Sequence, residues 1–164
     1  MKTSKWWKVV KSIIKVEIER RILMLYGRYE HTIDAKNRVF IPAKYKDALG
    51  TNFKITYNKL LSPCILVYSE EEWQEMQKKI KGLPSLQCQF FIREICSNTV
   101  DVQLDSQGRI VIPQYLKDKV GLEKNALFLG VGNHAEIWAP DVLEQKNAEV
   151  DLEELKRAMI DIGF

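Results

Sequence analysis

The sequence predicts an α+β fold rich in β-structure, in which two tandem repeats interleave into one pseudo-twofold barrel with short flanking helices. Three observations predict this fold. Residues 33–50 and 104–121 align without a gap, so the chain contains an internal repeat. Each copy has the pattern of strand, aspartate-led turn, strand and short helix. Hydrophobic residues make up 46% of the 164 residues, which is enough for a core, yet a repeat of about 45 residues cannot cover both faces of its own sheet.

Residues 1–23 form an N-terminal extension whose charge differs from that of the rest of the chain. The extension has seven lysines and arginines against two glutamates, whereas the remaining 141 residues have a net charge of −2. One interpretation is a basic amphipathic helix that binds a surface, with an apolar stripe of Trp6, Val9, Val10, Ile13 and Ile14. A secretory signal fits less well, because lysines interrupt the apolar segment. The favoured interpretation is a start codon assigned too far upstream, since Met24 opens a new segment and residues 19–21 can be encoded by GAA-AGG-AGG, a ribosome-binding sequence.

Residues 28–72 hold the first repeat. An alternating strand over residues 30–33 ends at Asp34, whose side chain is expected to accept backbone amides two residues further on. Asn37 supplies the turn residue that tolerates a positive φ. After a second strand over residues 38–41, Pro42 begins a short helix that ends at Gly50, and strands over residues 53–57 and 65–68 follow.

Residues 73–98 are predicted to be a helix and a linker, and residues 99–142 hold the second repeat. The helix begins after the capping pattern of residues 69–72, and the linker runs through residues 82–85. In the second repeat Asp105 and Gly108 take the places of Asp34 and Asn37 in the turn. Residues 143–164 form a C-terminal helical tail with an apolar face of Leu152, Leu155, Met159 and Ile160.

The sequence offers no recognisable catalytic or metal-binding residues. Asp34 and Asp105 are repeat-equivalent carboxylates, but the small hydroxylated residue and glycine that follow the acids of aspartic proteases are missing. His31 and His134 have no partner at metal-ligand spacing. There is no glycine-rich phosphate loop, and the three cysteines form no C-x-x-C pair. We therefore expect no catalytic residue, no metal, no cofactor and no small-molecule ligand.

The two turns carry the residues with binding potential. Each leaves an arginine, Arg38 or Arg109, projecting from a hairpin tip beside Lys36 or Gln107. A guanidinium group can bind guanine O6 and N7 bidentately or hold a phosphate, and the lysine and glutamine side chains can add contacts to phosphates or base edges. The alternative is that both arginines pair with the turn aspartates and serve folding. The two interpretations overlap, because the aspartate would orient the arginine in either case.

Four segments of the sequence resemble the MraZ family of bacterial transcriptional regulators. They are residues 26–38 (YGRYEHTIDAKNR), 40–43 (FIPA), 105–113 (DSQGRIVIP) and 136–138 (EIW), and the resemblance extends over residues 24–164. It implies two SpoVT/AbrB-type swapped-hairpin domains with a D-x-x-x-R motif in each. In this family the motif arginines, here Arg38 and Arg109, look like the DNA-contacting residues. Asn37 departs from the usual glycine, which affects the placement of Arg38.

The resemblance also implies a partner and a location. The expected function is that of a repressor that binds double-stranded DNA at short direct repeats upstream of the division and cell-wall gene cluster, including its own promoter. The expected assembly is a ring-like homo-oligomer in the cytoplasm, associated with the nucleoid, without enzymatic activity. Several tips binding in register would let a body of net charge −2 hold DNA. No apolar run approaches the length of a membrane span, so no membrane partner is expected. The alternative function is an AbrB-type antitoxin-like or general chromatin-binding module.

Overall fold

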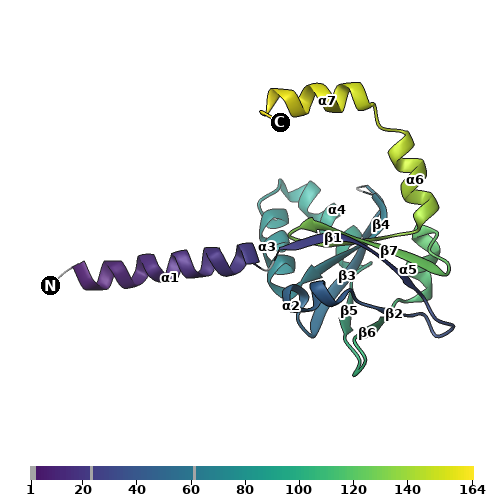
Figure 1. Cartoon of the computed structure of the whole chain (residues 1–164), viewed down its shortest axis with the longest axis horizontal. Coiled ribbons are helices and arrows are strands. Elements are labelled where there is room, and N and C mark those ends of the chain that lie inside the picture. Colours follow the sequence, from purple (N-terminus) through teal and green to yellow (C-terminus); the bar gives the residue numbers. More distant parts are fainter. Residues whose placement is uncertain (1–2, 23, 61) are drawn as a thin grey trace.

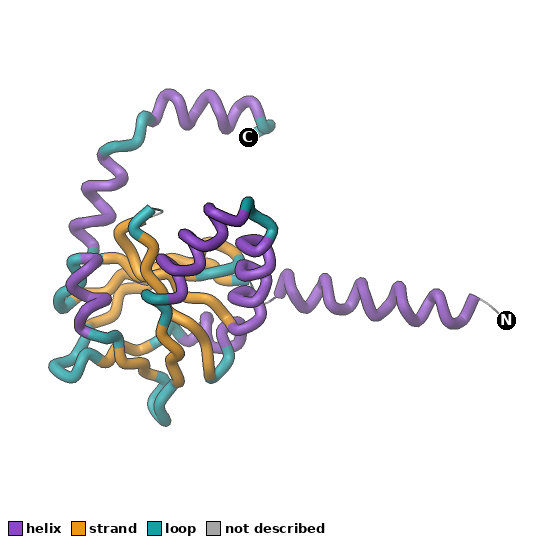
Figure 2. Tube along the Cα trace, turned by 180° about the vertical axis from the view of Figure 1, so that it is seen from behind, coloured by secondary structure: helices purple, strands orange, loops and turns teal. Residues whose placement is uncertain are grey.

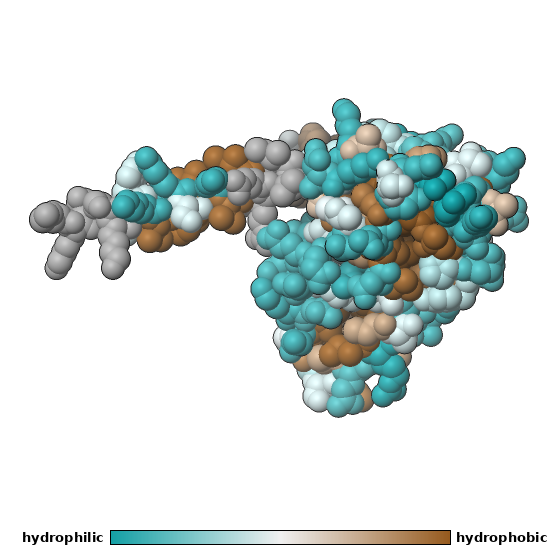
Figure 3. Space-filling model, turned by 90° about the horizontal axis from the view of Figure 1, so that it is seen from below, coloured by the Kyte–Doolittle hydropathy of each residue, from teal (hydrophilic) through white to brown (hydrophobic). Residues whose placement is uncertain are grey.

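The computed structural model describes residues 3–22, 24–60 and 62–164, which form a folded body with a helical arm on each side (Figure 1). One arm is α1 (Thr3–Ile22), a single helix that points away from the body. The other consists of α6 (Pro140–Ala148) and α7 (Leu152–Asp161). The extension is helical over α1, in which Trp6 and Ile13 are exposed, and Figure 3 shows apolar and hydrophilic residues along its length. The binding of a surface by this helix stays a prediction. The start-codon interpretation stays a prediction.

Each repeat contributes four strands to the body. Those of the first repeat are β1 (Leu25–Thr32), β2 (Arg38–Phe40), β3 (Asn52–Asn58) and β4 (Ser62–Ser69). Those of the second repeat are β5 (Val100–Gln103), β6 (Arg109–Val111), β7 (Asn125–Gly132) and β8 (Ala135–Trp138). Six of them form a sheet in the order β1-β7-β8-β4-β3-β5, with every neighbouring pair antiparallel. When each strand is replaced by its equivalent in the other repeat, the same order results, read from the opposite edge of the sheet. The strand order is therefore symmetric about the centre of the sheet.

The barrel expected from the sequence is not confirmed. Among the described residues the six-stranded sheet ends at β1 and β5, which do not pair with each other, and β2 and β6 form a separate two-stranded ribbon. The first strand of each repeat pairs with the third strand of the other, as β1 does with β7 and β5 with β3. The two repeats therefore exchange strands across the molecule, which agrees with an interleaved fold. Figure 2 shows the strands gathered in the body with helices around them, an α+β arrangement.

The helices begin and end largely where the local chemistry predicts. Pro42 precedes a short 3₁₀ turn, η1 (Ala43–Tyr45), and α2 (Lys46–Leu49), while Pro113 precedes α5 (Gln114–Val120). The hydroxyl of Ser69 accepts the amide of Glu72 at 3.2 Å and caps α3 (Glu70–Lys81). A further helix, α4 (Ser85–Cys96), occupies residues that the sequence analysis described only as part of a linker segment.

The main core is built equally from both repeats. The equivalent residues Val39 and Ile110 are almost fully buried, as are Ile41 and Ile112. Strands β1 and β7 cross so closely that a Cβ atom at Gly130 would lie 2.5 Å from backbone atoms of β1, which is why this position requires glycine. The shared core means that each repeat depends on the other for its burial, and it holds the two turns in a fixed relation.

Candidate nucleic-acid interface

The turn of the first repeat is held together by one aspartate side chain. Asp34 Oδ1 accepts the backbone amides of Lys36 and Arg38, both at 2.9 Å, and the Asp34 carbonyl oxygen accepts the amide of Asn37 at 2.9 Å. Asn37 has a φ of 59°, the left-handed conformation that the turn demands. The four residues from Asp34 to Asn37 thus turn the chain sharply and leave Lys36 exposed at the tip.

The turn of the second repeat has the same hydrogen bonds. Asp105 Oδ1 accepts the amides of Gln107 and Arg109 at 2.9 Å, and the Asp105 carbonyl accepts the amide of Gly108 at 2.9 Å. Gly108 has a φ of 81°, and Gln107 is exposed at the tip. The structure therefore places Asp105 and Gly108 in the turn backbone and Gln107 on its surface, in the same relation as in the first repeat.

Each motif arginine forms an ion pair with its own turn aspartate. Arg38 Nε and Nη2 both lie 2.7 Å from Asp34 Oδ2, and Arg109 Nε and Nη2 both lie 2.8 Å from Asp105 Oδ2. The side-chain hydrogen bond from Arg38 is the main cause that lowers the pKa of Asp34 to about 2. The pKa of Asp105 is also lowered, chiefly by the backbone hydrogen bond from Arg109. Because only Nε and Nη2 serve the carboxylate, the Nη1 donors of each guanidinium are left for another acceptor.

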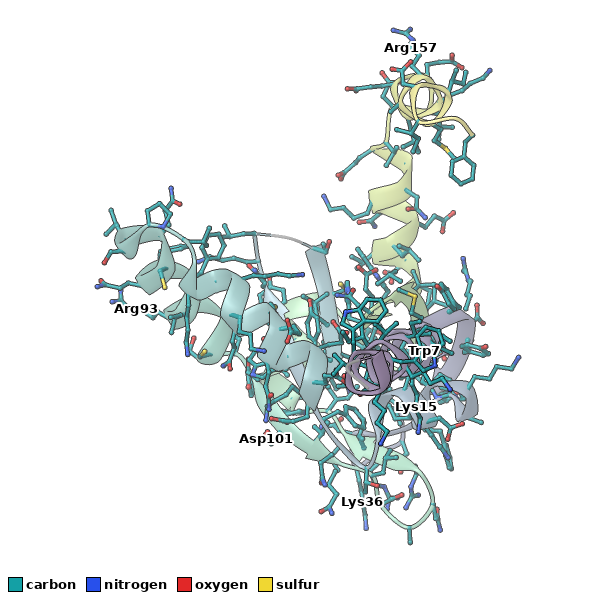
Figure 4. The ribbon with its side chains drawn as sticks, turned by 90° about the vertical axis from the view of Figure 1, so that its left-hand side faces the viewer. Trp7, Lys15, Lys36, Arg93, Asp101 and Arg157 are labelled. Atoms are coloured by element: carbon teal, nitrogen blue, oxygen red, sulfur yellow. The ribbon has the colours of Figure 1, made fainter. Side chains whose placement is uncertain are left out.

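The ribbon β2–β6 joins the two tips. Val39 pairs with Ile110 at its centre. Beyond the strand ends, the amide of Ile41 donates to the Gly108 carbonyl at 3.1 Å, and the amide of Ile112 donates to the Asn37 carbonyl at 2.9 Å. In Figure 1 the first tip lies at the lower right of the body and the second at its bottom, and Lys36 lies near the lower end of the body in Figure 4. The two arginines are therefore held by one short, symmetric piece of backbone.

The surroundings of the two arginines differ. The guanidinium carbon of Arg109 lies 5.7 Å from the centroid of the Phe40 ring, a cation–π arrangement. Arg38 pairs across the ribbon with Val111, which is the repeat equivalent of Phe40 and has no ring. The Arg109 side chain is 18% exposed and the Arg38 side chain 31%. The arginine of the second tip thus has an additional ring contact and is less exposed.

Two lysines that the sequence analysis did not single out lie against the turns. Lys117 is almost buried, and its Nζ donates to Asn37 Oδ1 at 2.8 Å, while Asn37 Nδ2 donates to Gln114 Oε1 at 3.0 Å. Lys46 is the repeat equivalent of Lys117, and a Cβ at Gly108 would lie 2.2 Å from its Nζ. The repeat alignment was the signal that could have found this pair. Polar contacts with Lys117 and Gln114 therefore hold Asn37. At the equivalent position of the second repeat, Lys46 covers Gly108.

Outside the two tips, the described residues form few groups that could bind a ligand or react. In residues 3–22, 24–60 and 62–164, no cluster of three or more histidines, cysteines, aspartates or glutamates is placed to hold a metal ion. Within the same ranges, none of the helices combines the length and the apolar character needed to cross a lipid bilayer. His31 and His134 lie apart, each in a ring contact, with Phe128 and Tyr68 respectively.

Comparison with known proteins finds relatives of a single family. The family model of the MraZ protein, described as antitoxin-like, matches residues 24–88 and 95–161. A protein of Thermoanaerobacter sp. (strain X514) named Transcriptional regulator MraZ is 42% identical over 145 residues, which span 86% of this chain and 100% of the relative. Its namesake in Thermoanaerobacter pseudethanolicus is 43% identical over 145 residues with the same coverage. In Clostridium beijerinckii the namesake is 38% identical over 144 residues, again 86% and 100% of the two chains.

Proposed function

Because the chain belongs to the MraZ family, whose relatives are named transcriptional regulators, we propose that it is a sequence-specific DNA-binding regulator that works without a cofactor or enzymatic activity. The observation that carries the proposal is the repeated tip. Two hairpins joined by the ribbon β2–β6, both in the lower half of the body in Figure 1, each present an arginine whose guanidinium is oriented by an aspartate. A preoriented guanidinium is well suited to bind guanine in the major groove.

The residues of each tip divide between reading bases and positioning the protein. Arg38 and Arg109 offer Nη1 and the second hydrogen of Nη2 to guanine O6 and N7, while Asp34 and Asp105 hold the planes of the two guanidinium groups. The exposed Lys36 reaches phosphate oxygens, which add affinity without sequence information. Gln107, at the same position of the other tip, can bind a phosphate or the edge of adenine.

We extend the proposal to the site and the assembly. The DNA is a set of short direct repeats upstream of the division and cell-wall gene cluster, including the promoter of this chain's own gene, and binding represses transcription. Several copies act together as a ring-like homo-oligomer, because one body of net charge −2 attracts DNA weakly and repeated tips raise the effective concentration. Action on the chromosome implies a place at the nucleoid.

The test is the affinity for a duplex that covers the region upstream of the chain's own gene, in competition with an unrelated duplex of equal length. Arg109→Ala and Arg38→Ala each remove a bidentate guanine contact of about 1–3 kcal/mol, which weakens binding about 5- to 150-fold. Arg157→Ala is the matched control, since this exposed arginine on α7 is remote from the tips (Figure 4). Equal affinities of the tip variants and the wild-type protein would refute the assignment.

A second function is favoured by one observation, the description of the family as antitoxin-like. In that case the chain is an AbrB-type module that binds another protein or coats DNA without regard to sequence. The same competition experiment separates the two functions. A general binder loses its signal equally to specific and unrelated competitor at physiological salt, whereas a sequence-specific regulator prefers its own site by about 10³-fold or more.

A further inference from the structure

Helix α7 is well defined at both ends by its own sequence. Asp151 Oδ1 accepts two backbone amides of the first turn at 2.9 and 3.1 Å. At the other end the amide of Phe164 donates to the carbonyl of Met159 at 3.0 Å, across Gly163 with a φ of 91°. This is the Schellman arrangement, in which a left-handed glycine closes a helix. Side-chain and backbone caps at both ends show that the local sequence favours a helix of this length.

This helix has an apolar face that no residue within 3–22, 24–60 or 62–164 covers. Leu152, Leu155 and Met159, with Ile162 just beyond the helix, recur at helical spacing on one side, opposite Glu153, Arg157 and Asp161. Ile160, which the sequence pattern assigned to this face, lies between the two sides. Every residue from 144 to 164 is nevertheless exposed. A helix of 10 residues is marginal in water on its own, and most helical stability in proteins comes from packing such a face. Packing another apolar surface against this face would therefore stabilise α7.

The body does not supply that partner within the same chain. Helix α6 is anchored by the buried Leu143 and carries α7 away from the sheet. Figures 1 and 4 both show α7 separated from α4, and in Figure 4 Arg157 points away from the body. An arm that is held out from the body is positioned to reach another molecule.

The body has an uncovered apolar surface of its own, on the outer side of α4. Leu86 is 82% exposed and Phe90 47%, and they lie one helical turn apart. With Phe91 and Arg93 they help to line an open hollow of about 430 Å³. No described element of the chain covers this hollow.

The two surfaces are complementary in charge as well as in apolar character. Helix α7 and its cap contain four carboxylates, Asp151, Glu153, Glu154 and Asp161, against the two cations Lys156 and Arg157. Arg93 borders the α4 hollow, and the last turn of the neighbouring α3 carries Lys78, Lys79 and Lys81. An amphipathic helix with a net negative charge therefore matches an apolar hollow that one arginine, Arg93, lines.

We propose that α7 of one copy packs its apolar face into the α4 hollow of a second copy. The proposal rests on the self-assembly proposed above and names the segments that perform it. Because the two surfaces differ, each copy gives one helix and receives another. Such a head-to-tail contact generates a ring when the rotation between copies closes.

The experiment measures the mass of the full-length protein in solution by light scattering after size exclusion. Leu155→Asp damages the donated helix, and Phe90→Asp damages the receiving hollow. Both side chains are exposed, so the fold of the body is retained, which circular dichroism checks. Arg157→Asp is the control, because it places a carboxylate on the opposite side of α7. We expect each of the first two variants to weaken association about 100-fold or more and to run as smaller species, whereas the control keeps the wild-type mass.

Mixing the two damaged variants tests the head-to-tail geometry directly. Leu155→Asp retains an intact hollow and Phe90→Asp retains an intact helix, so an equimolar mixture forms a heterodimer with one working contact. The proposal is overturned if the wild-type protein is monomeric, if either variant keeps the wild-type mass, or if the mixture does not associate. A lower unfolding temperature of Leu155→Asp without a change in mass indicates packing within one chain and also overturns it. DNA affinity, measured separately on Arg109→Ala of normal mass, tests the function of the tips independently of the contact.

Discussion

Asn37 offers a test of how the first tip is held, because two separate effects act on the same residue. Its φ of 59° disfavours any residue with a Cβ, by about 1–2 kcal/mol for most residues and less for asparagine. Its side chain accepts from the Lys117 ammonium at 2.8 Å and donates to Gln114 at 3.0 Å. Substitution by alanine keeps a Cβ in the left-handed conformation and removes both hydrogen bonds, whereas substitution by glycine removes the bonds and relieves the backbone.

The magnitudes follow from these contacts. Loss of Asn37 Oδ1 leaves the nearly buried ammonium of Lys117 without this partner, which costs about 1–3 kcal/mol. Asn37→Ala adds the backbone penalty, so the total loss of unfolding free energy is about 2–4 kcal/mol. Asn37→Gly offsets part of the lost hydrogen bonds by removing strain, and its loss is about 1 kcal/mol or less.

Urea unfolding at one fixed protein concentration measures both variants. Lys117→Met serves as the second arm of a double-mutant cycle, because it removes the ammonium and keeps an apolar stem of similar length. The reasoning predicts that Asn37→Ala is clearly less stable than Asn37→Gly and that the substitutions at positions 37 and 117 are not additive. Equal stability of the alanine and glycine variants, or full additivity with Lys117→Met, would refute it.

Three further predictions concern titration, DNA binding and thiol reactivity. The pKa of Asp34 lies below its ordinary value of 3.8, so its stabilising contribution is present above that value and is lost as the pH falls toward about 2; acid unfolding of Asp34→Asn should lack this step. Phe40→Leu removes the ring beside Arg109 and should weaken DNA binding about 2- to 5-fold in a gel-shift assay, while the fold is unchanged. Burial raises the pKa of the Cys64 thiol, so a thiol reagent should modify the exposed Cys96 in the native protein and reach Cys64 only after unfolding.

The sequence predicted best those features that depend on neighbouring residues. The repeat located both turns, because an aspartate followed at three residues by asparagine or glycine sets its own hydrogen bonds. Ser69 capped α3 as its spacing indicated. The prolines at 42 and 113 preceded short helices for equally local reasons.

The features that depend on distant residues were not predictable in the same way. The sequence predicted that the two repeats interleave. Alternation of side chains predicts a strand but not its partner, so the pairs β1–β7 and β3–β5 and the separate ribbon β2–β6 were not specified, and the barrel is not confirmed. Helix α4 was missed because residues 90–92 form a short apolar run that is ambiguous between strand and helix. The contact of Lys117 with Asn37 joins residues 80 positions apart, and only the folded chain brings them together.

The ribbon that joins the two hairpins has a consequence for the symmetry of the target. Two identical subunits related by a twofold axis present identical tips, and the DNA they read is correspondingly palindromic. Here both tips belong to one polypeptide, so each half has been free to change alone. Asn37 in the first repeat corresponds to Gly108 in the second, and Phe40 corresponds to Val111. Under the proposed function, a single chain can therefore recognise two unlike half-sites, so that its target has a direction. Copies arranged head to tail would then bind successive targets in the same orientation.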